Sequence, residues 1–195
     1  MTIPTHEHER HEEAREALDY IRRTMESASN FTAVSGWGLL GVGTVGLVAA
    51  WVAWSTGDPT ALWVWLPSLT LAIAIAMVAN AWKARATAVP LWSGSFRKLA
   101  WVMAPALAAG GMLTWALAAA GQMNLIPGMW LALYGAAVTA GGTLSVRAIR
   151  TMGIVVLCLG GLAFARPEWN AALLATGFGL VHLVFGVRLV MKHGG

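Results

Sequence analysis

Long apolar runs, separated by short polar segments, fill this chain from residue 31 almost to its end. The runs cover residues 32–54, 61–82, 98–120, 126–146, 151–165 and 170–191. A helix needs about 20 apolar residues to cross about 30 Å of hydrocarbon. The pattern therefore predicts an all-α fold, a polytopic membrane bundle of six transmembrane helices. The fifth run is the shortest, so Arg150 and Arg166 at its ends would have to extend outward to the membrane surfaces.

A polar segment precedes the first run and divides the chain into residues 1–30 and 31–195. Within it, Ala14, Leu18, Ile21 and Met25 recur at helical spacing among charged residues, which predicts an amphipathic helix over residues 5–28 on the cytoplasmic side. Its narrow apolar face could pack on the protein's own cytoplasmic face. It could also bind another helix or a second copy, or remain solvated.

The composition excludes a soluble protein, because 57% of the residues are apolar and 11% are charged, against about 25% charged in soluble domains. The net charge of +4 would suggest a nucleic-acid ligand in a soluble protein. Here the basic residues lie in short segments beside the predicted spans, where they set orientation instead. We therefore expect the lipid bilayer, and no nucleic acid, as a partner.

The distribution of basic residues predicts the orientation. With six spans, twelve of the 13 Lys and Arg residues fall on one side: Arg10, Arg15, Arg22, Arg23, Lys83, Arg85, Arg97, Lys98, Arg147, Arg150, Arg188 and Lys192. The other side holds Arg166. The positive-inside rule then places both termini in the cytoplasm.

Each connection on the outer side contains or adjoins a proline, Pro59, Pro127 or Pro167, which predicts three tight helical hairpins. The longer inner connection, 83–97, contains apolar and aromatic residues that favour the headgroup region: Val89, Pro90, Leu91, Trp92 and Phe96. We expect it to be mobile or to bind a partner.

His182 is the only ionisable residue deep inside a predicted span, and it is the one candidate for a functional site. It shares a helix face with Ala175, Gly179 and Gly186, on which another helix can approach closely. We therefore expect His182 to point into the bundle. Its role could be structural, as a neutral imidazole bonded to a hydroxyl or a freed carbonyl on a facing helix. It could instead be a proton relay, a haem ligand or a substrate contact.

Small residues and prolines mark the other spans. The glycines of the first span fall on more than one face, and Gly128, Ala132, Ala136 and Ala140 form a stripe at i+4 spacing on the fourth. Such faces serve packing within the bundle, or contact with another membrane protein or a second copy. Pro67 and Pro105 predict helix kinks.

The sequence contains no catalytic motif. The predicted bundle contains no buried Asp, Glu or Lys, and this absence counts against ion-coupled transport. His6, His8 and His11 lack a closed ligand set, so we expect no metal site and no cofactor. These patterns favour a non-enzymatic membrane protein that acts as an accessory, sensor or scaffold subunit. The alternatives are a small-solute channel or carrier, and a haem- or quinone-binding subunit.

Several segments resemble a group of uncharacterised bacterial six-helix integral membrane proteins. They are the run from Ile21 to Glu26, Phe31, Ser35 and Gly36, the run from Gly177 to Gly186, and the final Gly194 and Gly195. The resemblance implies a bacterial inner-membrane location and implies no activity.

Overall fold

The computed structural model describes residues 12–21, 34–58, 60–86, 94–143 and 146–193. The chain divides into two compact units, Met1–Phe31 and Thr32–Gly195. In the first unit, residues 12–21 form a helix on which Leu18 and Ile21 are exposed. The rest of the helix predicted over residues 5–28 lies outside the described residues.

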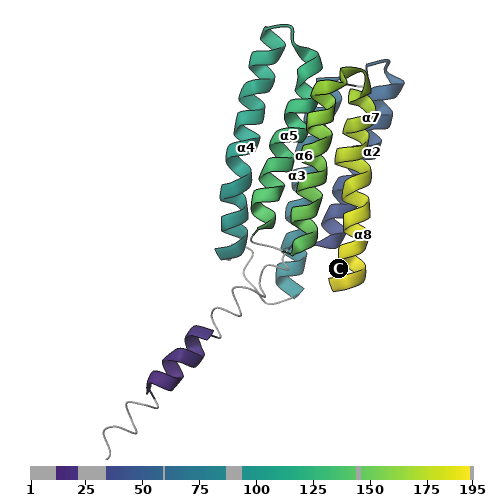
Figure 1. The fold of residues 1–195 in the computed structure, drawn as a ribbon. Helices are drawn as coiled ribbons and strands as arrows, with labels where there is room; N and C mark the ends of the chain where they lie inside the picture. Colours follow the sequence, from purple (N-terminus) through teal and green to yellow (C-terminus); the bar gives the residue numbers. More distant parts are fainter. Residues whose placement is uncertain (1–11, 22–33, 59, 87–93, 144–145, 194–195) are drawn as a thin grey trace, which may run out of the picture. The chain divides into compact units, whose positions relative to one another are not determined.

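The second unit is a bundle of helices, and the described ranges contain no strand (Figure 1). Six helical segments are long and apolar enough to cross a membrane, so the predicted all-α polytopic bundle is confirmed. Five of these segments correspond to α2 (Gly36–Ser55), α3 (Leu62–Ala86), α4 (Gly94–Ala119), α5 (Ile126–Gly142) and α6 (Arg147–Ala165). The sixth contains α7 (Asn170–Leu174), the π-helix η4 (Ala175–Leu180) and α8 (Val181–His193). Two 3-10 turns, η2 (Met123–Leu125) and η3 (Pro167–Trp169), precede α5 and α7.

Two predicted boundaries were wrong. The fifth span begins at Arg147 and reaches 19 residues, because its first turn contains the basic residues assigned to the preceding loop. The connection predicted over residues 83–97 is shorter than expected, since α3 continues to Ala86 and α4 begins at Gly94. Long basic side chains can keep their charges in water while the helix continues, and positive charge in a last turn is favourable. Phe96 therefore belongs to α4, and residues 87–93 lie outside the described residues.

The start of α2 is fixed by polar contacts. The Ser35 hydroxyl oxygen accepts a hydrogen bond from the Gly38 amide at 3.2 Å, which caps the helix. The Ser35 amide donates to Oδ1 of Asn80 at 3.0 Å, so the same residue joins α2 to α3. At the opposite end of α2, Gly57 has a φ of +79°, a conformation that glycine adopts without strain.

Glycines allow the backbones of α5 and α6 to meet. A Cβ added at Gly135 would meet the Leu157 amide, and one at Gly160 would lie 2.5 Å from the Ala132 amide. The predicted stripe on the fourth span is only partly correct: Gly128 and Ala132 face α6, whereas Ala136 and Ala140 are exposed. The reason is geometric, because each step of four residues turns about 40° past a full helical turn.

The glycines of α2 serve two faces, as the sequence predicts. Gly38 and Gly41 face Ala79 and Ile75 of α3. Gly43 faces Leu183 of α8, and a Cβ at Gly46 would meet the Phe178 carbonyl of η4. The sixth segment is thus held against α2, and this contact positions His182.

Candidate functional site: a buried Tyr–His pair beside an apolar cavity

His182 lies in the first turn of α8 and is completely buried, with 0% of its surface exposed. Gly179 and Gly186, on the same helix face, pack against Leu47 and Leu40 of α2. The prediction that His182 points into the bundle is therefore confirmed. The histidine is held between α2 and the helices on the other side of the bundle.

The π-helix η4 supplies the first partner of His182. The Val181 amide donates to the Thr176 carbonyl, five residues back, instead of the Gly177 carbonyl, four residues back. The Gly177 carbonyl is thereby released from its α-helical partner and lies 2.9 Å from Nδ1 of His182. The sequence predicted either a hydroxyl or a freed carbonyl on a facing helix as the partner, and the carbonyl lies instead on the same segment as His182. Such π segments occur often at functional sites.

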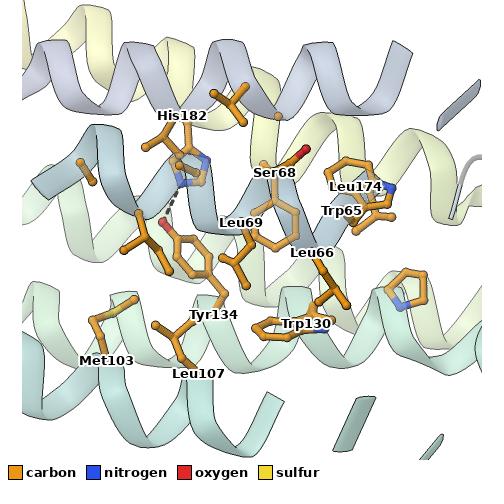
Figure 2. A pocket seen from close by; sticks show the side chains of 18 of the residues that line it. Trp65, Leu66, Ser68, Leu69, Met103, Leu107, Trp130, Tyr134, Leu174 and His182 are labelled. Atoms are coloured by element: carbon orange, nitrogen blue, oxygen red, sulfur yellow. Dashed lines mark hydrogen bonds between the residues drawn. The ribbon is translucent and has the colours of Figure 1, made fainter. Parts of the chain in front are cut away.

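The second partner is Tyr134 of α5, whose hydroxyl lies 2.6 Å from Nε2 of His182. Figure 2 shows the two side chains pointing toward one another from different helices. This bond joins two residues that are 48 positions apart in the sequence. It provides the hydroxyl partner that the sequence predicts for a neutral histidine within a span.

Two further aromatic rings, Phe178 and Trp65, form a cluster with this pair. Phe178 of η4 stacks on His182, with ring centroids 6.4 Å apart. The Phe178 centroid lies 5.4 Å from that of Tyr134 and 6.3 Å from that of Trp65. The cluster thus draws on α3, α5, η4 and α8. Phe178 thus contacts both members of the polar pair, and Trp65 packs behind it.

A cavity of about 290 Å³ lies beside the cluster, at the small end of the range of ligand pockets, about 300–1,000 Å³. Its wall is formed by α2, α3, α4, α5 and the sixth segment (Figure 2). The lining residues are Val42, Val45, Gly46, Thr60, Leu62, Trp65, Leu66, Ser68, Leu69, Ala72, Ile73, Ala76, Met77, Leu99, Met103, Leu107, Ile126, Pro127, Trp130, Tyr134, Leu174, Phe178 and His182. Apolar side chains dominate this list.

The packing of α3 and α4 explains why a cavity exists here. The helix α3 packs mainly on α2, and α4 packs mainly on α5. Both contribute side chains to the cavity, such as Leu69 and Leu107. Each also contains a proline, Pro67 or Pro105, through which the helix continues. The kinks predicted at these prolines stay predictions.

The polar side chains in the wall have defined partners. The Ser68 hydroxyl donates to the Val64 carbonyl at 2.8 Å. The Trp130 indole donates to the Thr114 hydroxyl oxygen at 2.9 Å, and this bond joins α5 to α4. At the end of the cavity near the α2–α3 connection, the Thr60 hydroxyl donates to Oδ1 of Asp58 at 3.0 Å.

This arrangement suits binding of an apolar molecule more than binding of haem or metal. Both ring nitrogens of His182 already have partners, so an iron atom would have to displace Tyr134 or Gly177. Among the described residues, no three His, Cys, Asp or Glu side chains are grouped to hold a metal ion. The candidate residues His6, His8 and His11 lie outside the described residues.

The sequence pattern indicates His182 as a site residue but does not indicate Tyr134, Ser68 or the π segment. A signal for Tyr134 exists, because its hydroxyl lies in the middle of a span and needs a partner there. The π segment contains Gly177 and Gly179, but no local pattern in the sequence predicts that a helix will widen there.

No family model, curated protein or solved structure matches this chain. The fold and the site define its class: a six-helix, multi-pass membrane protein with a buried Tyr–His pair beside an apolar cavity.

Proposed function

We propose that this chain is a non-enzymatic integral membrane protein that binds a small apolar molecule in the cavity between α3 and α4. It would act as a sensor or accessory subunit, whose ligand links the two loosely packed helices to the rest of the bundle. The observation that carries this proposal is the cavity itself, because its wall is mostly apolar and includes the hydrogen-bonded pair Tyr134 and His182. Apolar walls with a few placed polar groups are typical of small-molecule sites.

The proposed location is the bacterial inner membrane, with both termini in the cytoplasm. The twelve basic residues on one side and the single Arg166 on the other support this orientation. The resemblance to bacterial six-helix membrane proteins supports the choice of membrane. The possible partners are another membrane protein or a second copy, through helix faces that remain exposed, such as the one with Ala136 and Ala140.

Binding of n-decanol to the purified protein tests the proposal. Native mass spectrometry of protein released from detergent micelles would count bound molecules as the n-decanol concentration rises. Ala72 lines the cavity, whereas Ala74 of the same helix is exposed and does not. We expect saturable binding of one molecule that Ala72→Phe abolishes and Ala74→Phe leaves unchanged. Equal binding by both variants would overturn the proposal.

The second candidate is a small-solute carrier, and the π-helix η4 is the observation in its favour. Irregular helices that release carbonyls near the middle of a span are typical of transporter sites. Here the Gly177 carbonyl is used by His182, and the cavity wall is mostly apolar, which counts against a polar solute. Flux of a small neutral solute, such as glycerol, into proteoliposomes would support the carrier, provided that Ala72→Phe blocks it.

A further inference from the structure

We propose that the cavity selects a neutral, membrane-dissolved alcohol, whose hydroxyl donates a hydrogen bond to the Tyr134 oxygen. This inference rests on the proposed function, because it names the ligand class of the same cavity. The group that the pair offers to a ligand depends on where the protons of Tyr134 and His182 lie.

The Gly177 carbonyl fixes the position of the histidine proton. A carbonyl oxygen can only accept, so Nδ1 of His182, 2.9 Å away, carries the proton that it donates. A neutral imidazole, which an intramembrane site favours, has one ring proton. Nε2 must then accept, and the Tyr134 hydroxyl donates to it across 2.6 Å. The single proton of Tyr134 is therefore directed at His182, and its oxygen keeps lone pairs.

Other polar side chains in the wall show the same arrangement. The protons of the Ser68 hydroxyl and the Trp130 indole are given to Val64 and Thr114, respectively. Ser68 also keeps lone pairs on its oxygen. Ser68 therefore offers a ligand an acceptor, and neither Ser68 nor Trp130 offers it a free proton.

This distribution of donors and acceptors discriminates between ligands of the same size. An alcohol can donate to the Tyr134 oxygen and leave the bond to His182 intact. An ether, a ketone or a quinone has only acceptor oxygens, which would lie against the acceptor of Tyr134. A buried polar group without a partner is unfavourable, so such ligands should bind less tightly. A cationic donor, such as an ammonium group, would enter the apolar cavity at high cost.

The test compares n-decanol with decyl methyl ether, which has the same chain and lacks the hydroxyl proton. Both are titrated into the wild-type protein in detergent, with native mass spectrometry as the readout. We expect n-decanol to bind about two- to tenfold more tightly, the range for one net hydrogen bond. Equal or weaker binding of the alcohol would overturn this inference while leaving the proposed function in place. If neither compound bound in a saturable manner, the proposed function itself would fail.

Three variants locate the acceptor. The double variant Tyr134→Phe/His182→Leu removes both members of the pair, and we expect it to bind the two compounds equally. Ser68→Ala and Trp65→Phe each remove one other polar group of the wall, and both should keep the preference for n-decanol. If the double variant kept the preference, or if Ser68→Ala or Trp65→Phe lost it, the assignment to Tyr134 would be wrong. The comparison of the two compounds uses the wild-type protein, so its result does not depend on whether these variants fold.

Discussion

The Tyr134 hydroxyl and Nε2 of His182 lie 2.6 Å apart and join α5 to α8 inside the bundle. His182 also holds the Gly177 carbonyl that the π-helix releases. One side chain thus satisfies a polar group on a facing helix and another on its own segment. Removal of the histidine therefore leaves two partners unsatisfied, whereas removal of the tyrosine hydroxyl leaves one.

This difference predicts the result of a double-mutant cycle on the free energy of unfolding. We expect His182→Leu to destabilise the protein by about 1–2 kcal/mol and Tyr134→Phe by less, with a coupling of about 0.6–1.7 kcal/mol. His182→Gln keeps a donor and an acceptor and should be tolerated. The measurement is unfolding in mixed micelles by titration with sodium dodecyl sulfate.

The cycle also tests whether His182 has a structural role. A coupling of zero would show that the hydrogen bond contributes nothing to stability. Unchanged stability in His182→Gln and His182→Leu, with n-decanol binding lost in both, would show that the histidine serves binding alone.

The sequence was sufficient to predict the six spans, because the length and hydropathy of each run reflect the thickness of a membrane. It was also sufficient to predict the burial of His182, since a polar side chain within a span is unfavourable against lipid and the neighbouring glycines let another helix approach that face. The cavity could not be predicted in this way. Apolar residues surround α3 on all sides, so hydropathy does not show which face packs and which face lines a space. That choice depends on how side-chain volumes fit across five segments.

The packing of α5 on α6 gives a second prediction, from two adjacent glycines. A Cβ at Gly160 would lie 2.5 Å from the Ala132 amide, whereas a Cβ at Gly161 would have nothing within 4 Å. We expect Gly160→Ala to lower the free energy of unfolding by about 1–3 kcal/mol, because a backbone must move. Gly161→Ala should be neutral or stabilising by about 0.5 kcal/mol, because alanine favours a helix. The same loss of stability in both variants would contradict the close contact between α5 and α6.

The bond between Trp130 and Thr114 gives a third prediction. Thr114 is buried and accepts from the Trp130 indole at 2.9 Å, whereas the exposed Thr70 donates to the Leu66 carbonyl of its own helix. Thr114→Val should lower the free energy of unfolding by about 1 kcal/mol, because the indole proton loses its partner. Thr70→Val is the matched control and should change it by less than about 0.5 kcal/mol. If the two variants had equal stability, the bond between α4 and α5 would contribute nothing.

The division of the chain into two compact units gives a fourth prediction. Residues 1–26 contain no predicted span, and the described helices of the bundle begin at Gly36. Deletion of residues 1–26 should therefore leave the bundle inserted in the membrane, with its melting temperature in detergent unchanged. Degradation of the truncated protein, or its failure to insert, would show that the segment belongs to the core fold.

The distribution of basic residues gives the last prediction, that both termini face the cytoplasm. Cys158 is a free cysteine, so the background for labelling is Cys158→Ala. In that background, Thr5→Cys and His193→Cys should resist a membrane-impermeant thiol reagent in intact cells and react after lysis. Gly57→Cys, in the connection between α2 and α3, should react in intact cells, because a first span that starts in the cytoplasm would end outside. Labelling of either terminus in intact cells would contradict the orientation, and protection of Gly57→Cys with both termini labelled would show that it is inverted.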